Sequence, residues 1–410
     1  MRIALAMCAF IAVDELLCLR LHKQGVMQGL LGVINSLAYV LGFPGAAANS
    51  LLTRCPTEHI AGANWVLYLG CNFVLYFIGL CTLARVKHLF QPSRRVFVSQ
   101  LENASSEKPV NLNRRRLFKK TFDIAAGCTM SGAMGYSLVM EPGEIRITNR
   151  KIGIRDLPTE LNGLRLAQVS DVHHGPWLSI EHVREVVRRT NELEADMVLL
   201  TGDYVYASPV YIEPVVAELA KIKSRIGMVG ILGNHDWWDR GVPMKKAFAD
   251  NGINLIDNSR VFISSDRKLK GEKVLADSQA DGGYARGLWI AGVGDLWEDL
   301  PDYHAALHGI PEQMPRLLLA HNPDAAEDPK FLAGKYRVDL MISGHTHGGQ
   351  VRLPGIGAVI VPSKFGQKYA QGLVQSPTCP VFVSKGIGLS GLPVRFGVPP
   401  EIVVLELERA

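Results

Sequence analysis

Five short apolar runs between residues 164 and 350 each end in a cluster of polar side chains. The runs cover residues 164–169, 196–200, 228–232, 317–320 and 338–343. Segments with the apolar spacing of helices separate several of them, at 180–191, 215–223 and 242–250. Strands that alternate with helices form a largely parallel sheet covered by helices. The pattern therefore predicts an α/β fold in which the polar clusters meet at the carboxyl ends of the strands, where such folds bind ligands.

Four further segments complete the predicted domain. Residues 145–154 are expected to form a pair of strands, residues 288–293 another strand, and residues 401–407 a closing strand. The polar, glycine-containing stretch 264–286 lacks periodicity and is expected to be a long surface loop. The α/β domain is thus expected to cover residues 145–410.

The polar clusters combine two carboxylates, one amide and five imidazoles. Burying so many polar groups without partners would be costly, and two divalent cations would account for nearly all of them. Mixed nitrogen and oxygen ligands suit Mn, Fe, Zn or Co better than Ca, and the two oxygens of one carboxylate, Asp203, could bridge two ions. The clustered residues are Asp171, His173, Asp203, Asn234, His235, His321, His345 and His347.

The last cluster lies in the sequence Gly344-His345-Thr346-His347-Gly348-Gly349-Gln350. In an extended segment, side chains two residues apart point to the same side, so both imidazoles can converge on one point. A single His-x-His motif is weak evidence, because a structural histidine is the more common explanation. The metal hypothesis depends on the other four clusters.

The order of the motifs is Asp-x-His, Gly-Asp, Gly-Asn-His-Asp, His and Gly-His-x-His. Over residues 160–360 it resembles the calcineurin-like metallophosphoesterases. The resemblance implies a layered αββα sandwich, two divalent metal ions and hydrolysis of a phosphoester. It also implies that Asp203 bridges the ions and that His235 is catalytic and faces the leaving group. The remaining ligands implied are Asp171, His173 and His347 for one ion, and Asn234, His321 and His345 for the other.

Further residues refine the resemblance. Protein Ser/Thr phosphatases carry Gly-Asp-x-x-Asp-Arg, whereas residues 202–206 read Gly-Asp-Tyr-Val-Tyr, which argues against a protein phosphatase. Asp236 is an alternative carboxylate partner for His235, and His174 is a second residue that could touch phosphate, although neighbouring side chains usually point apart. The tail at 384–397 resembles a membrane-tethered branch that includes UDP-2,3-diacylglucosamine pyrophosphatases and exported phosphodiesterases.

Residues 1–87 have the composition of a membrane region. Three apolar stretches, 3–21, 27–52 and 64–86, predict two or three transmembrane helices, because the uncharged segment 65–84 is long enough to cross a bilayer. The first stretch contains Asp14 and Glu15, which favours an interfacial or cleaved segment as the alternative. Pro44 would kink the second stretch. A buried soluble bundle is the remaining interpretation.

Residues 88–120 are expected to be a basic cytoplasmic linker, since ten Lys/Arg and two Glu lie between positions 85 and 120. After Arg115-Arg116, the Gly/Ala-rich stretch 121–140 resembles a twin-arginine export signal or a further span. If it crosses, the following domain is extracytoplasmic; otherwise that domain faces the cytoplasm. Net charge is +8 over residues 1–140 and −3 over 141–410, which gives no indication of a nucleic-acid partner.

The predicted protein is therefore an integral membrane phosphohydrolase that cleaves a phosphodiester or pyrophosphate bond. One expected substrate class is a lipid-linked nucleotide sugar such as UDP-2,3-diacylglucosamine, used in lipid A synthesis. A general extracytoplasmic phosphodiesterase is the alternative. A non-catalytic membrane module that keeps the fold as a binding surface is the third hypothesis, and the complete ligand set argues against it.

Overall fold

The computed structural model describes residues 135–206, 208–238, 241–271, 286–391 and 393–410, together with Thr121, Thr129, Gly132 and Ala133. The predicted spans in 1–87 and the linker 88–120 lie outside the described residues, as does most of 121–140. Within the described part, no helix combines the length and apolarity that a membrane crossing requires. The described residues all belong to one compact unit, Lys120–Ala410.

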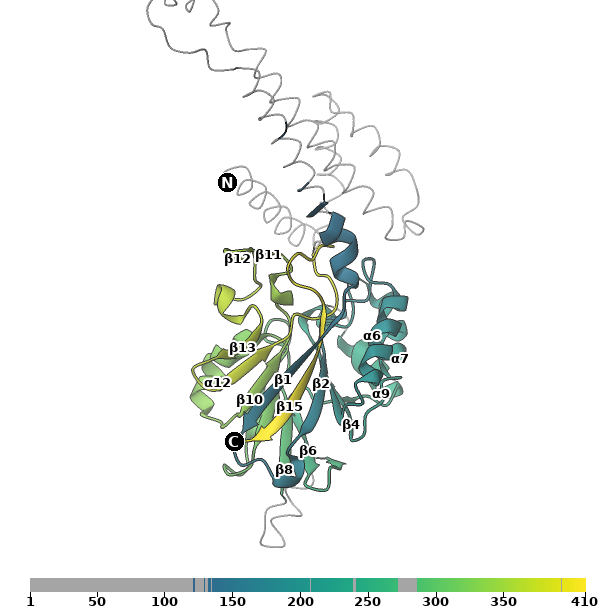
Figure 1. Cartoon of the computed structure of the whole chain (residues 1–410). Helices are drawn as coiled ribbons and strands as arrows, with labels where there is room; N and C mark the ends of the chain where they lie inside the picture. The colour runs from purple at the N-terminus through teal and green to yellow at the C-terminus, as the bar shows by residue number, and fades with distance from the viewer. Residues whose placement is uncertain are drawn as a thin grey trace, which may run out of the picture. The chain divides into compact units, whose positions relative to one another are not determined.

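Two β-sheets pack face to face at the centre of this unit (Figure 1). The first sheet has the order β1 (Arg146–Ile154), β15 (Glu401–Arg409), β2 (Leu164–Val169), β3 (Met197–Thr201), β4 (Gly227–Ile231), β5 (Asn254–Leu255). The second has the order β13 (Gly372–Gln375), β14 (Pro380–Val383), β10 (Leu340–Ser343), β9 (Arg316–Leu319), β8 (Gly287–Gly292), β6 (Ser259–Ser264), β7 (Leu269–Lys270). A small hairpin pairs β11 (Arg352–Leu353) with β12 (Gly357–Ala358).

Helices cover the outer face of each sheet. Helices α6 (Ile180–Glu192), α7 (Ile212–Leu219) and α9 (Gly241–Asp250) pack on the first sheet through a cluster that includes Val186, Val215 and Phe248. Helices α11 (Tyr303–Leu307) and α12 (Pro329–Gly334) pack on the second through Trp289 and Phe331. Between the sheets, aliphatic side chains from both inner faces form a third apolar layer. The α/β prediction is confirmed, and the layers form the αββα sandwich that the resemblance implied.

The pairing of strands differs from the sequence prediction in two ways. Residues 145–154 form one strand and not a pair, because β1 runs parallel to the C-terminal strand β15 over its whole length. The strand pattern predicted a single central sheet, whereas the structure has two sheets. The apolar pattern marks which segments are strands, but it does not state which segments pair.

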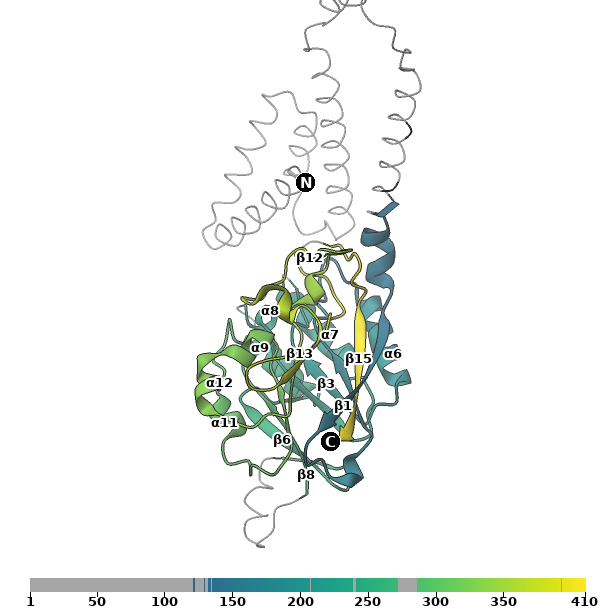
Figure 2. The same ribbon diagram turned by 60° about the vertical axis from the view of Figure 1, so that its left-hand side comes forward.

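One edge of the sandwich collects the carboxyl ends of the strands. In the first sheet β2, β3 and β4 are parallel, and in the second β8, β9, β10 and β14 are parallel. Strand β15 runs antiparallel to β2 and therefore begins beside its carboxyl end. Arg146 pairs with Glu401, so the chain enters the domain at this edge as well, through the short turns η2 (Tyr136–Met140) and η3 (Glu141–Gly143) (Figures 1 and 2). We call it the carboxyl-end edge.

Candidate metal centre

Loops after β2, β3 and β4 of the first sheet and after β9 and β10 of the second bring the predicted polar residues into one buried site. All eight of these side chains are buried. Seven of them fall into three groups in which the ligand atoms lie within 4.8 Å of one another, and Asn234 directly precedes His235. The groups are Asp171, His173 and His347; His173, Asp203 and His235; and Asp203, His321 and His345.

The carboxylate of Asp203 lies between two sets of imidazoles. Its Oδ2 is 3.2 Å from Nε2 of His321 and 3.4 Å from Nε2 of His173. On the far side of His173, its Nε2 is 2.9 Å from Nε2 of His347, which is 3.4 Å from Oδ1 of Asp171. One carboxylate thus joins two adjacent clusters of nitrogen and oxygen atoms.

The backbone at the site adopts conformations that side chains usually avoid. Asp171, His173, Asp203, His345 and His347 all have positive φ, between 49° and 69°. Such angles are uncommon outside glycine and concentrate where function requires them. The sequence prediction that His345 and His347 lie in an extended segment is wrong, since both sit in left-handed turns. They face different groups, His345 with His321 and His347 with Asp171.

Two glycines allow the loops to approach the carboxylates. A Cβ atom on Gly344 would lie 2.2 Å from Oδ2 of Asp171, and one on Gly233 would lie 2.3 Å from Oδ1 of Asp203. Neither position has room for a side chain. The glycines of the Gly-His-x-His and Gly-Asn-His-Asp motifs therefore allow these loops to pack directly against the two carboxylates.

Backbone groups orient the ligands and leave acceptors directed into the site. The N–H of His345 donates to Asp171 at 2.8 Å, and the N–H of His235 donates to Asp203 at 2.8 Å. Nδ1 of His321 lies 2.7 Å from the Thr201 carbonyl, which fixes the proton on Nδ1 and leaves the lone pair on Nε2. Nε2 of His345 and Oδ1 of Asn234 are buried without a hydrogen-bond partner. Buried acceptors of this kind fit divalent cations.

The electrostatics of the site point the same way. Burial lowers the pKa of His345 to about 3 and also lowers the pKa of His173 and His347, so these imidazoles are neutral, as metal ligands must be. Burial opposes the charged form of Asp203, but His321, His235 and His173 together outweigh it and lower the Asp203 pKa. Burial likewise opposes protonation of His321, yet Asp203 outweighs it and raises the His321 pKa. A cation between these two would take the place of that proton.

The side chain of Asp236 is an acceptor for backbone N–H groups. Its carboxylate accepts N–H groups from Asp203, Tyr204 and Gly233 at 2.7, 2.8 and 2.9 Å. Burial, followed by the neighbouring Asp203 carboxylate, raises the pKa of Asp236 to about 8. Because every group that contacts it here is a donor, this geometry suits the ionised carboxylate that results once cations neutralise Asp203.

His174 turns away from the metal ligands. Its Nδ1 lies 2.8 Å from the Leu178 carbonyl, and its ring packs against Tyr211 with a centroid distance of 5.0 Å. These contacts make His174 a packing residue of the loop after β2, and they give it no position facing phosphate.

Three aromatic side chains surround the site. The sequence placed Trp238 beside the motifs, with packing as its expected role, and it gave Tyr206 and Trp297 no role at the site. Trp238 and Tyr206 lie 4.0 and 5.3 Å from the His235 ring, and Trp297 lies 4.3 Å from the His345 ring, measured between centroids. Trp297 is 46% exposed. The Asp295 carboxylate positions it by accepting the backbone N–H of Trp297 at 2.8 Å. The available signal was Asp295 itself, a polar residue at a strand end outside the five motifs.

A buried arginine side chain also contacts the site. The guanidinium of Arg395 is fully buried and donates to the carbonyls of Gly388 and Val398 at 2.6 and 3.0 Å. Its Nη2 lies 3.4 Å from Nδ1 of His347. Arg395 thereby holds the loop after β14 against a predicted metal ligand, a role that its place in the tail motif did not reveal.

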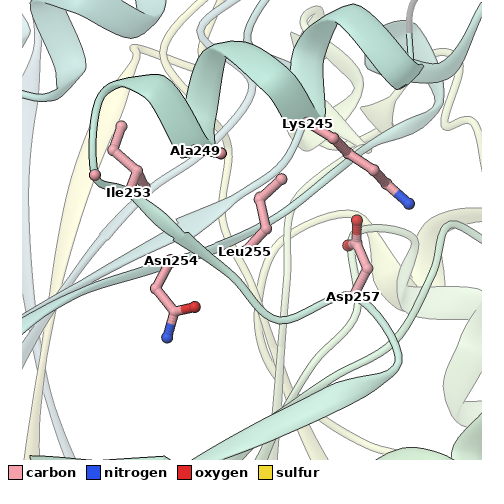
Figure 3. Close-up of a pocket in the computed structure, with 7 residues that line it drawn as sticks. Lys245, Ala249, Ile253, Asn254, Leu255 and Asp257 are labelled. Atoms are coloured by element: carbon pink, nitrogen blue, oxygen red, sulfur yellow. The ribbon is translucent and has the colours of Figure 1, made fainter.

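A separate hollow of about 520 Å³ lies between α9 and β5 (Figure 3). Lys245 and Asp257 line it together with Ala249, Ile253 and Leu255. Asp257 accepts the Leu232 N–H at 3.0 Å, two residues before Asn234. None of the predicted metal ligands lines this hollow.

Comparison with known proteins identifies the family. Residues 164–349 match the model of the calcineurin-like phosphoesterases. The chain is 32% identical over 302 residues to the uncharacterized metallophosphoesterase YkuE of Bacillus subtilis, a match that covers 72% of this chain and 98% of that protein. The chain belongs to the calcineurin-like phosphoesterases. As a calcineurin-like phosphoesterase it is a hydrolase acting on phosphoester bonds, in a family that uses divalent metals, so the predictions of family and of an enzyme are confirmed.

Two other relatives of this calcineurin-like phosphoesterase have more specific names. It is 30% identical over 276 residues to the transmembrane protein with metallophosphoesterase domain of Danio rerio, covering 67% of this chain and 60% of that protein. It is 25% identical over 303 residues to the UDP-2,3-diacylglucosamine pyrophosphatase LpxG of Chlamydia trachomatis, covering 65% of this chain and 90% of that protein.

Proposed function

We propose that the chain is a dinuclear, divalent-metal-dependent hydrolase of a phosphodiester or pyrophosphate bond. The observation that carries this proposal is the position of the Asp203 carboxylate between two clusters of buried imidazoles. Asp203 would bridge two ions of Mn, Fe, Zn or Co. Asp171, His173 and His347 would complete one ion's ligands, and Asn234, His321 and His345 would complete those of the other.

Two divalent ions, when bound, polarise the phosphoryl oxygens and lower the pKa of an attacking water. The chain's own residues orient the reaction. Asp203 and Asp171 are fixed through backbone N–H groups, so their free lone pairs keep one direction. The ring of His235 lies 4.7 Å from that of His173, between centroids, and Trp238 and Tyr206 pack against it. From there His235 can donate a proton to the departing oxygen.

The first experiment measures hydrolysis of bis-p-nitrophenyl phosphate by the purified full chain. Turnover with Mn²⁺ is expected to disappear on treatment with a chelator and to return when Mn²⁺ is added back. Equal turnover before and after removal of the metal would contradict the dinuclear mechanism.

We also propose that residues 1–87 anchor the enzyme in a membrane by two or three helices, with 88–120 as a cytoplasmic linker and 121–140 as a further span or export-signal-like segment. The uncharged stretch 65–84 and the ten basic residues between positions 85 and 120 support this. The similarity to a protein named as transmembrane adds to it. In this arrangement the domain at 145–410 is extracytoplasmic.

For the substrate we propose a lipid-linked phosphoester, supported by the similarity to a UDP-2,3-diacylglucosamine pyrophosphatase. A UDP-linked lipid is presented at the cytoplasmic face, which conflicts with an extracytoplasmic domain. A reporter fused after Arg150 separates the two cases. Active alkaline phosphatase with dark green fluorescent protein favours an exported phosphodiesterase, and the reverse pattern favours the nucleotide-linked lipid.

A further inference from the structure

The exposed apolar side chains of the described residues gather at the carboxyl-end edge. Fifteen large hydrophobic residues are exposed in the described segments, and only Leu332 on α12 lies elsewhere. The others belong to β1 and to residues 136–143 before it, which we call the entry segment, to the connections that follow β3, β4, β8 and β10, and to β13 beside the end of β14. They are Tyr136, Val139, Met140, Ile147, Val210, Val242, Trp297, Leu300, Leu353, Ile356, Val359, Ile360, Phe365 and Leu373.

The densest part of this surface is the segment 351–365, which contains the β11–β12 hairpin and which we call the apolar hairpin. Ile356 at its turn is 66% exposed, and Ile360 is 56% exposed. Both views show β12 at the same end of the domain as the entry segment (Figures 1 and 2). Clustered exposed apolar side chains on a soluble surface mark a binding site for another apolar surface.

The base of the apolar hairpin is fixed to the metal centre. The N–H of Arg352 donates to the Phe396 carbonyl at 2.8 Å, and the N–H of Phe396 donates to the Gln350 carbonyl at 2.8 Å. The N–H of Gln350 in turn donates to the carbonyl of His347 at 3.0 Å. The tip therefore presents its apolar side chains from a base held against a predicted metal ligand.

Basic residues flank the hairpin. Between residues 340 and 400 the chain has five Lys/Arg and no Asp or Glu, but Arg395 is buried, and Lys368 and Lys385 pair with Glu327 and Glu401. Arg352 lies at one end of the hairpin and Lys364 at the other. Lys364 is exposed directly before Phe365. Apolar side chains flanked by basic ones are typical of segments that lie in the interface of an anionic bilayer.

The entry segment, residues 136–143, lies on the same surface. Glu141 is buried, and its carboxylate accepts the N–H groups of Gly397 and Val398 at 3.0 and 2.6 Å. The entry segment is thus tied to the loop that also holds the apolar hairpin through Phe396. Any membrane anchor in the 135 residues that precede Tyr136 would tether the domain at its carboxyl-end edge.

We propose that the carboxyl-end edge is a membrane-docking surface, and that the apolar hairpin enters the interface of an anionic bilayer. The metal centre then opens toward phosphate groups at the bilayer surface. This inference rests on the proposed phosphohydrolase function and adds the physical state of its substrate: a phosphoester presented in a lipid layer. A soluble phosphoester reaches the same centre without help from the hairpin.

The first test locates the hairpin tip relative to lipid. The full chain is reconstituted in phosphatidylcholine/phosphatidylglycerol vesicles with an environment-sensitive fluorescent amino acid in place of Ile356. The control places it at Glu160, in the turn before β2 at the opposite edge. Spin-labelled lipids are expected to quench the probe at position 356 and not at 160. Absence of quenching at 356, or quenching there by a second spin-labelled copy of the chain instead of lipid, overturns the proposal.

The second test compares two substrates. It measures the ratio of turnover on a diacylglycerol 4-methylumbelliferyl phosphodiester in vesicles to turnover on bis-p-nitrophenyl phosphate. Ile356→Asp is expected to lower this ratio by about tenfold. Ile356→Trp should keep the ratio, because tryptophan is favoured at bilayer interfaces. An unchanged ratio in Ile356→Asp overturns the docking proposal. Failure of the unsubstituted enzyme to hydrolyse either substrate with Mn²⁺ overturns the proposed function itself.

Discussion

The carboxylate of Asp236 accepts the backbone N–H of Asp203 at 2.7 Å. The same carboxylate accepts the N–H groups of Tyr204 and Gly233. One side chain therefore joins the loop after β3, which carries the proposed bridging ligand, to the loop after β4, which carries Asn234 and His235. The distance between the two proposed ions depends on this link.

Asp236→Asn should weaken both folding and metal binding. The amide replaces an acceptor with a donor that faces backbone N–H groups, so at least one of them loses its partner. Leaving a buried donor unsatisfied costs about 1–3 kcal/mol. Thermal unfolding and Mn²⁺ titration of the purified variant measure the two effects.

Asp196→Asn is the matched control for that substitution. Asp196 also accepts a backbone N–H, from Arg165 at 2.9 Å, but it lies at the opposite end of β3. It should lose stability and keep metal affinity. Equal Mn²⁺ affinity in the two variants would show that Asp236 does not position the metal centre.

Asp203→Asn should remove most of the bound metal. Asp203 belongs to one ligand group with His173 and to another with His321, so its loss affects both proposed ions. Metal analysis of the purified protein is expected to show fewer than one ion per chain, with hydrolysis of bis-p-nitrophenyl phosphate abolished. Asp295→Asn, a strand-end aspartate outside the three ligand groups, should retain its metal. Two ions retained in Asp203→Asn would exclude Asp203 as the bridge.

The sequence was sufficient to locate the strands that carry the site. Strand β2 has the predicted bounds, and β3, β4, β8 and β9 begin and end within one residue of theirs, because short apolar runs followed by polar clusters are a local signal. The partners of β1 were not predictable in this way. Its pairing with β15 joins residues more than 250 positions apart, and nothing in the local pattern of either segment states it.

The ligand types could be predicted, whereas the residues that support them could not. Histidine and aspartate after a strand indicate metal chemistry by their type. Asp236, Trp297 and Arg395 act through contacts with backbone or rings that only the folded chain creates. The left-handed turns at His345 and His347 were also hidden, since neither is a residue type that requires positive φ.

His235→Ala should keep the metal and lose turnover. General-acid help at a leaving group is typically worth about 10²–10⁴-fold. The loss should be large for an alkyl phosphodiester and small for p-nitrophenyl leaving groups, which depart without a proton. Comparing kcat for a series of leaving groups tests this. A loss that is independent of leaving-group pKa would assign His235 a different role.

Asp257 gives a prediction about pH. Burial raises the pKa of Asp257 to about 7, while the Leu232 N–H and Lys245 act in the opposite direction. Its unfolded value is about 3.9. The folded chain therefore binds the proton more tightly, and the contribution of Asp257 to stability falls as pH rises from about 4 to 7.

Asp257→Asn keeps an oxygen for the Leu232 N–H and stays neutral. Relative to the unsubstituted chain, it should gain roughly 1–3 kcal/mol of unfolding free energy between pH 4.5 and pH 8, measured in chelator. Asp250→Asn, an exposed change on the same hollow's helix α9, should show no such trend. A difference between Asp257→Asn and the unsubstituted chain that stays constant with pH would mean that Asp257 is ionised throughout this range.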